Sequence, residues 1–199
     1  MDRAQRTLPE PRTDGPMSLE TAIAQRRSVR QYGPLDLTLG EIGQLLWSAQ
    51  GITGKTQNRR AAPSAGGRHP LAFYVCRQDG IWRYYPQGHM LREHLAQDVR
   101  EDLAEAAWRQ DFIGRAPCVF AVTAIFARTI EQYEDRGKLR YVPMDTGHAT
   151  ENLSLQAVAL GLGSVSVGAF DDEAVKRVLA LPEEEEPMYL VPVGHPRER

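Results

Sequence analysis

Cysteine is scarce in this chain of 199 residues, which contains only Cys76 and Cys118. The two thiols show no CxxC spacing, so the sequence has neither a disulfide framework nor a zinc ribbon. Both lie inside apolar runs that are typical of strands. We therefore expect two buried free thiols and a cytoplasmic protein.

Metal-binding patterns are absent as well. The chain has no HExxH motif and no pair of histidines at the spacing of metal ligands, so we expect no metal site. A GxSxG elbow, which would carry a nucleophilic serine, is also missing. The five histidines are His69, His89, His94, His148 and His195. We expect His148, on an apolar segment, to be a hydrogen-bonded core residue.

Long hydrophobic runs and an excess of charge are lacking too. No run is long enough to cross a bilayer, and the first residues lack the apolar core of a signal peptide. The net charge of -2 gives no general attraction to nucleic acid or to a membrane. With 42% hydrophobic and 25% charged residues, the chain is typical of one globular domain. We expect that domain at residues 17–199, after a disordered or draped arm at residues 1–16.

Capping and turn signals outline the secondary structure. Ser18 is a candidate N-cap, Thr38 and Glu41 form a capping box, and Asp79-Gly80 predicts a hairpin. Helices are expected at 18–27, 38–49, 98–110, 145–162 and 171–181, and a charged helix or lid-like segment at 129–138. Strands are expected at 71–77, 81–85, 118–126, 164–169 and 188–193. Because strands and helices do not alternate regularly, we expect an α+β fold with a sheet covered by helices.

Two other segments bear on assembly and surface. The segment Asp145–Leu162 is apolar on nearly every face, so we expect a partner subunit to cover one side of that helix. The acidic run Glu183–Glu186 is most simply a solvated loop.

Three arginines and a serine follow the first helix, at Arg26, Arg27, Ser28 and Arg30. Guanidinium groups bind phosphate oxygens through paired hydrogen bonds, and a serine hydroxyl adds another. The same residues could form only a basic, solvated helix end. From these residues alone, both interpretations stay open.

A second stretch, Pro63–Gly67, offers bare backbone in a long polar loop. Such a loop suits the close approach of a flat ring, although a plain surface turn has the same composition.

The order of these motifs resembles a known family. After the arginine motif come Gly51-Ile52-Thr53-Gly54 and Pro63–Gly67, and the buried helix begins Asp145-Thr146-Gly147-His148. The final motifs are the glycine-containing segment 161–170 and a closing segment 190–196. Together they resemble the nitroreductase superfamily of FMN enzymes, and within it the SagB-type branch, over residues 18–196.

The resemblance implies a nitroreductase-like α+β fold, with a central, mostly antiparallel sheet flanked by helices, in an intertwined homodimer. Two FMN sites would lie at the subunit interface. Arg26 and Ser28 would bind the FMN phosphate, with Arg27 in support. Arg30 would lie beside N1 and the C2 carbonyl of the ring, where a cation stabilises the charge of reduced flavin.

Further site residues follow from the same resemblance. The loop residues Pro63, Ser64, Ala65 and Gly66 would come from the other subunit and lie against the ring. Backbone N–H groups of the segment Val167-Gly168-Ala169 would lie near flavin N5. Arg197 would add a contact to the phosphate.

The resemblance also implies an activity. We expect an oxidoreductase that transfers hydride through flavin N5 between NAD(P)H and a small organic acceptor. Azoline dehydrogenases of the SagB-type branch use a Lys-Tyr pair, and the matching position here is Gln132-Tyr133. Tyr133 therefore stays a candidate catalytic residue, whereas glutamine cannot act as a base. Azoline dehydrogenation in peptide modification and non-catalytic flavin binding are the alternatives.

Overall fold

A single antiparallel sheet organises the molecule. The computed structural model describes residues 4–54 and 59–197. Seven strands pair in the order β1-β4-β3-β2-β5-β7-β6, and all six pairings are antiparallel. The strands are β1 (Gln5–Thr7), β2 (Leu71–Arg77), β3 (Gly80–Tyr85), β4 (Met90–Leu95), β5 (Cys118–Ala124), β6 (Gly163–Ser164) and β7 (Glu186–Gly194).

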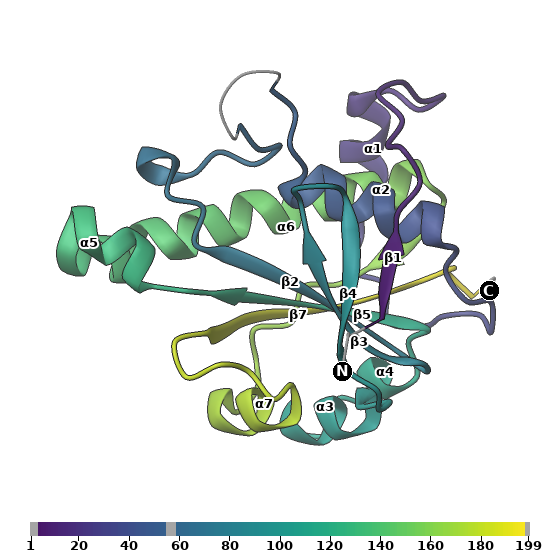
Figure 1. The fold of residues 1–199 in the computed structure, drawn as a ribbon. Helices are drawn as coiled ribbons and strands as arrows, with labels where there is room; N and C mark the ends of the chain where they lie inside the picture. Colours follow the sequence, from purple (N-terminus) through teal and green to yellow (C-terminus); the bar gives the residue numbers. More distant parts are fainter. Residues whose placement is uncertain (1–3, 55–58, 198–199) are drawn as a thin grey trace.

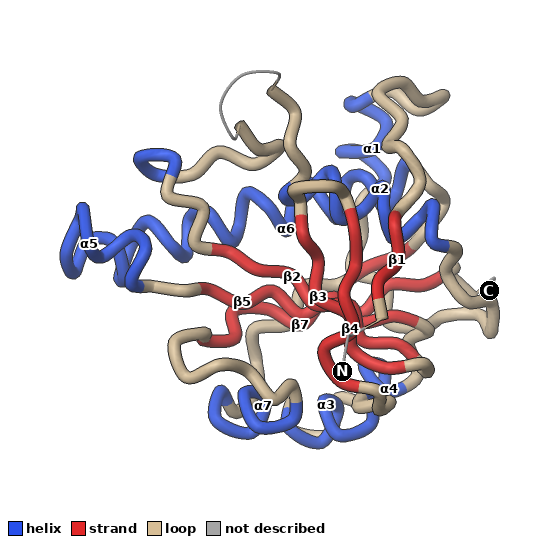
Figure 2. The backbone as a smooth tube through the Cα atoms, in the orientation of Figure 1, coloured by secondary structure: helices blue, strands red, loops and turns tan. Residues whose placement is uncertain are grey.

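Helices cover both faces of this sheet (Figures 1 and 2). They are α1 (Leu19–Gln25), α2 (Leu39–Gln50), α3 (Arg100–Ala106), α4 (Asp111–Gly114), α5 (Ala127–Arg136), α6 (Val142–Ala159) and α7 (Asp172–Val178), with a 3-10 turn at Ala65–Gly67 and a π turn at Gly137–Tyr141. One hydrophobic core lies between the sheet and α2 with α6, and a second between the sheet and α3 with α7. The expected α+β architecture is confirmed.

Capping and turn residues in the sequence predicted the ends of several helices and strands correctly. The Ser18 hydroxyl accepts a hydrogen bond from the backbone N–H of Thr21 and caps α1. Thr38 and Glu41 form the expected reciprocal capping box at α2. The turn at Asp79 joins β2 and β3 as an antiparallel hairpin. At the two helix starts the signal is a side chain that satisfies nearby backbone groups, and at the turn it is Gly80 with a φ of 123°, so little distant information is needed.

The amino-terminal segment, which was expected to be a disordered or draped arm, contains a short strand. Gln5–Thr7 pairs with Met90–Arg92 at the edge of the sheet, and Leu8 beyond it is buried. The strand β4, which lies between β1 and β3, was not foreseen, because half of the residues of Met90–Leu95 are polar and they lack an alternating pattern. The short edge strand β1 pairs only with Met90–Arg92, and five of the six residues of β4 stay at least partly exposed, so this mixed composition is tolerated.

Two expected elements are shorter than their patterns suggest. The helix expected at 98–110 is interrupted because Trp108 and Arg109 adopt φ angles of 54° and 62°, which end α3 before α4 begins. The strand expected at 164–169 is reduced to β6 and a single bridge between Val167 and Leu190.

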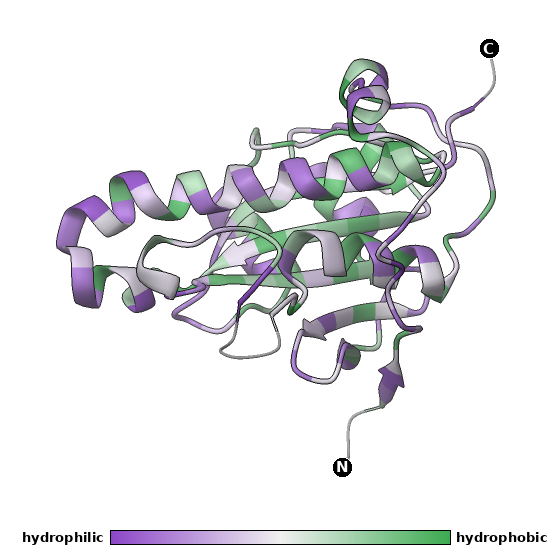
Figure 3. Cartoon of the chain, turned by 90° about the horizontal axis from the view of Figure 1, so that it is seen from above, coloured by the Kyte–Doolittle hydropathy of each residue, from purple (hydrophilic) through white to green (hydrophobic). Residues whose placement is uncertain are grey.

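The long helix α6 is not apolar all round. Hydrophilic and hydrophobic residues alternate along it in Figure 3. Its buried side faces the sheet and α2, and its outer side exposes Gly147, His148 and Glu151. The expectation that His148 is a core residue is wrong. It shares the exposed side of α6 with Met144 and Glu151, four residues before it and three residues after it.

The acidic run contains a second correction. Glu185 is not solvated but 1% exposed, and its carboxylate accepts hydrogen bonds from Tyr74 and Thr123, each at 2.9 Å, and from Arg83 at 2.5 Å. A charge can be buried here because two hydroxyls and one guanidinium donate hydrogen bonds to it. These partners are distant in sequence, so composition could not reveal them.

Both cysteines are buried free thiols, as expected. Burial raises the pKa of Cys118 to about 12. Within residues 4–54 and 59–197, no helix is long and apolar enough to cross a membrane. No group of three or more metal-ligating side chains occurs in that same part of the chain.

Candidate functional site

The predicted site residues form two groups at different ends of α6 (Figure 1). The first group begins at Arg26, whose guanidinium lies 3.4 Å from the carboxylate of Glu151 in the second half of the helix. The second group is the loop that contains Ser64, which is bonded to Asp145 in the first turn of the helix. The two groups do not meet within one chain.

Backbone contacts fix the segment that follows α1. The N–H of Val29 donates to the carbonyl of Ser164 at 2.9 Å, and Ser28 pairs with Ser164 as a parallel bridge. A Cβ atom on Gly163 would lie 2.7 Å from the side chain of Val29, so this approach requires glycine. The arginine motif is therefore held against β6 rather than left as a mobile helix end.

The three arginines of the motif have different environments. Arg27 donates to the carbonyls of Ala24 and Arg26, at 3.0 and 2.6 Å, and thereby satisfies the end of α1. Arg26 forms a salt bridge with Glu151. Arg30 is exposed, and its guanidinium carbon lies 5.6 Å from the ring centroid of Phe112. Among the described residues, no carboxylate forms a salt bridge with Arg30.

The carboxyl-terminal segment runs beside the same motif. The N–H of Arg197 donates to the carbonyl of Gln31 at 3.1 Å, and the N–H of Gly33 donates to the carbonyl of His195 at 2.8 Å. Arg197 itself is exposed. The structure therefore brings the backbone of Arg197 next to the arginine motif.

The segment Val167–Ala169 also joins this first group. Val167 exchanges two backbone hydrogen bonds with Leu190, which leaves Gly168 and Ala169 exposed beyond the sheet. The carbonyl of Ala169 accepts a hydrogen bond of 2.8 Å from Gln110, two residues before the Phe112 ring that Arg30 faces. A guanidinium, the Ser28 hydroxyl and exposed backbone thus converge in one region.

The second group is built around Asp145. Its carboxylate accepts a hydrogen bond of 2.6 Å from the Ser64 hydroxyl and one of 3.4 Å from the Ala65 N–H. The Ser64 oxygen in turn accepts from the N–H of His69 at 2.9 Å. Burial raises the pKa of Asp145, and the hydrogen bonds from Ser64 and Ala65 oppose that rise. The Ser64 side chain therefore holds its own loop in place.

Gly66 adopts a left-handed backbone conformation that favours glycine. Its φ is +57°, and a Cβ atom there would lie 2.6 Å from the Tyr133 hydroxyl and 2.8 Å from Gln132 Oε1. Gln132 accepts a hydrogen bond of 2.8 Å from Arg68 of the same loop. Tyr133 packs edge-on against Tyr141, with ring centroids 4.9 Å apart. The structure thus brings Tyr133 to the loop that contains Pro63, Ser64, Ala65 and Gly66.

Sequence reasoning missed the roles of Asp145 and Arg68. An acidic residue at the start of a helix that is otherwise rich in apolar residues is a usable signal, because a buried carboxylate needs partners. The partner loop could not be named, since it lies 81 residues earlier in the chain.

The donors of the first group suit a phosphorylated, flat cofactor. Guanidinium and hydroxyl groups bind phosphate, and exposed backbone at Gly168 allows a ring to approach closely. An ideal Cβ atom on Gly168 would meet only the ring of Tyr189 within 4 Å, at 3.2 Å. The group is therefore compatible with FMN.

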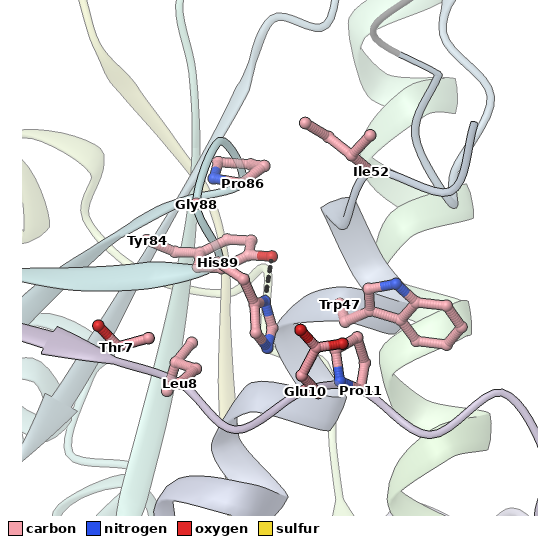
Figure 4. A pocket seen from close by; sticks show the side chains of 10 residues that line it. All are labelled: Thr7, Leu8, Glu10, Pro11, Trp47, Ile52, Tyr84, Pro86, Gly88 and His89. Atoms are coloured by element: carbon pink, nitrogen blue, oxygen red, sulfur yellow. Dashed lines mark hydrogen bonds between the residues drawn. The ribbon is translucent and has the colours of Figure 1, made fainter. Parts of the chain in front are cut away.

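A cavity of about 500 Å³ lies elsewhere (Figure 4). It is located between α2, the β3–β4 turn and the segment that follows β1, where the Tyr84 hydroxyl and His89 Nδ1 are 3.0 Å apart. None of the predicted site residues lines it. This cavity is therefore separate from both groups of predicted site residues.

Comparisons with known proteins agree with the fold and the motif order. The model of the Nitroreductase family matches residues 23–195. A candidate nitroreductase of Methanocaldococcus jannaschii is 41% identical over 184 residues, which cover 89% of this chain and 91% of that protein. A candidate nitroreductase of Ralstonia eutropha has a crystal structure with a TM-score of 0.89 and 31% identity, covering 98% of this chain and 90% of the other.

A more distant structure extends the similarity of fold. The NADPH:FMN oxidoreductase of Vibrio harveyi, solved with NAD+, has a TM-score of 0.68 and 19% identity. The match covers 90% of this chain and 69% of that one.

Proposed function

Because the chain belongs to the nitroreductase family and is an oxidoreductase of that type, we propose that it binds FMN and uses NAD(P)H as the electron donor. The observation that carries the proposal is the position of Arg30. This exposed guanidinium has no salt bridge among the described residues and lies in the same region as the exposed backbone of Gly168 and Ala169. The cofactor named for the Vibrio harveyi oxidoreductase supports the choice of FMN.

The residues of the first group would bind two different parts of FMN, the phosphate and the ring. Ser28, Arg26 and Arg197 would hold the phosphate, and Arg27 would support them by fixing the end of α1 through its two carbonyl contacts. Arg30 would place a positive charge beside the pyrimidine edge of the ring. Bound FMN would supply hydride transfer through N5 from NAD(P)H to a small organic acceptor.

We further propose a homodimer, in which the loop Pro63–Gly67 of one subunit completes the site of the other. Within one chain this loop and the arginine motif lie apart, so a second copy is needed to bring them together. Exposed apolar side chains support such an interface: Leu19 and Ile23 of α1 are 62% and 56% exposed, and Met144 of α6 is also exposed. A monomer mass by light scattering would contradict this part of the proposal.

Tyr133 is the candidate for proton transfer. Its hydroxyl lies beside Gly66, so it would reach the ring together with that loop. Gln132 is occupied by its hydrogen bond from Arg68 and cannot act as a base. Positioning and charge, rather than acid–base chemistry, would therefore supply most of the protein's contribution.

The decisive experiment is the absorption spectrum of the purified protein, followed by release of the ligand and measurement of its mass. We expect a yellow protein that releases FMN. A colourless protein that does not bind added FMN would overturn the cofactor. Rapid mixing with NADH and with NADPH tests turnover, because bleaching of the bound flavin distinguishes an oxidoreductase from a flavin carrier.

A further inference from the structure

A cavity of about 230 Å³ lies where β2 begins and β3 ends, at a distance in sequence from the arginine motif. Its lining residues come from α2, the loop before β2, the β2–β3 hairpin and the start of α5. Three of these residues are arginines, Arg60, Arg83 and Arg128, and none is acidic. The cavity therefore has an unusual concentration of positive charge.

Only one of the three arginines is compensated. Arg83 bonds to the buried carboxylate of Glu185 at 2.5 Å. Arg60 and Arg128 form no salt bridge with any described carboxylate. Arg128 uses one nitrogen to donate to the carbonyl of His69 at 3.1 Å, which leaves its charge unpaired. Two guanidiniums thus face one cavity without a counter-charge.

Polar atoms at this cavity also lack partners. Arg60 Nε and Gln50 Oε1 are buried without a hydrogen bond among the described residues. A buried polar group without a partner is costly, so each such group in a native protein needs an explanation. The Gln50 amide can be turned by 180°, which would place its N–H where the oxygen now lies.

The charges around Arg60 also favour a bound anion. Burial lowers the pKa of Arg60, and the nearby positive charge of Arg128 lowers it further, although the Tyr84 phenol acts in the opposite sense. An anion between the two guanidiniums would remove the repulsion and satisfy the free N–H groups.

We propose that this cavity is a binding site for an oxyanion group, phosphate or carboxylate, of a small ligand. Arg60 and Arg128 supply the charge, and Gln50 supplies a further donor. A water molecule occupies about 30 Å³ in the liquid, so the cavity has room for a phosphate and part of the group attached to it. The site does not depend on flavin binding, because it contains none of the residues assigned to FMN.

The test is calorimetric titration of the purified protein, saturated with FMN, with inorganic phosphate and separately with acetate at constant ionic strength. We expect at least one anion to bind. FMN saturation fills the arginine motif with its own phosphate, so binding that persists must occur elsewhere. If the protein binds no FMN, the same titration on the flavin-free protein tests this site independently of the proposed function.

Two variants locate the anion. Arg60→Gln and Arg128→Gln should each weaken binding about tenfold or more, because each removes a charged hydrogen-bond donor. Arg115→Gln, at an exposed arginine of the α4 end, is the control and should bind as the wild type does. Arg128 lies on an exposed helix start, so its variant remains informative if Arg60→Gln does not fold. Absence of binding by both anions, displacement by FMN, or unchanged affinity in both variants would overturn the proposal.

Discussion

The hydroxyl of Ser64 donates to the carboxylate of Asp145 over 2.6 Å and ties a glycine-containing loop to the first turn of α6. The two residues are 81 positions apart, so this bond can form only after the sheet and the helix have come together. It fixes the backbone from Ser64 to His69, since the Ser64 oxygen also accepts the His69 N–H. The conformation of the candidate flavin-binding loop therefore depends on one buried carboxylate.

The first prediction concerns the loss of this carboxylate. Asp145→Ala would leave the Ser64 hydroxyl and the Ala65 N–H without their partner, so the free energy of unfolding should fall by about 1–3 kcal/mol. Urea unfolding measures this loss. In flavin titrations the variant should also bind FMN more weakly, because the loop is no longer held.

Two control variants separate the anchor from its charge. Asp145→Asn keeps an acceptor for Ser64 and should retain most of the stability. Asp14→Ala removes an exposed carboxylate from the amino-terminal segment and should change stability by less than about 0.5 kcal/mol. Equal stability of Asp145→Ala and the wild type would show that the bond does not hold the loop.

The second prediction is the pH dependence of stability from the same residue. Burial raises the pKa of Asp145 above its ordinary value of 3.8. The folded state therefore binds the proton more tightly than the unfolded state, and this contribution is complete below the unfolded pKa. It is lost as pH rises through the folded pKa.

Asp145→Asn has no proton to lose at this position. Urea midpoints measured from about pH 4 to pH 7 should therefore show the wild type losing stability relative to Asp145→Asn as pH rises. A wild type that gains stability relative to the variant over this range would contradict the raised pKa.

The third prediction concerns the buried carboxylate of Glu185. Glu185→Ala would leave Arg83 without its buried counter-charge and two hydroxyls, those of Tyr74 and Thr123, without an acceptor. Breaking a buried ion pair in this way costs about 3–5 kcal/mol. The neighbouring Glu184 is exposed, and Glu184→Ala serves as a matched control. Similar unfolding free energies for the two variants would contradict the compensated burial of Glu185.

Most of the fold could be predicted because its signals are local. The capping box at Thr38, the hairpin turn at Asp79 and the apolar run of β5 each depend on neighbouring residues. Strand β4 carries no such pattern, since only Leu91 of its six residues is buried. The break after α3 depends on positive φ angles at Trp108 and Arg109. The residue types Trp and Arg do not predict such angles.

The residues of the candidate site fall into the same two classes: those that a local motif predicts and those whose contacts are distant in sequence. Arg30, Ser28 and Gly66 could be named because their motifs are contiguous and their order resembles a family. The contacts of Asp145, Glu185 and Arg60 arise only when distant segments meet. Sequence composition therefore misassigned the acidic run that contains Glu185 and passed over the uncompensated charge at Arg60.

The fourth prediction tests the charge assigned to the flavin ring. Arg30 has no salt bridge among the described residues, so its full charge is available to stabilise a reduced, anionic flavin. Arg30→Gln should lower the reduction potential of bound FMN, since the oxidised form carries no such charge. A charged hydrogen bond worth about 1.5–3 kcal/mol corresponds to about 30–65 mV for a two-electron couple.

Arg115→Gln is the matched control for this measurement, because Arg115 is exposed and paired with Asp111 on α4. Its potential should equal that of the wild type in a redox titration followed by flavin absorbance. An unchanged reduction potential in Arg30→Gln with FMN still bound would show that Arg30 does not lie beside the flavin ring. If Arg30→Gln binds FMN more weakly but the potential of the remaining holoprotein is unchanged, Arg30 would instead contact the phosphate. A contact there affects the affinity for both redox states equally.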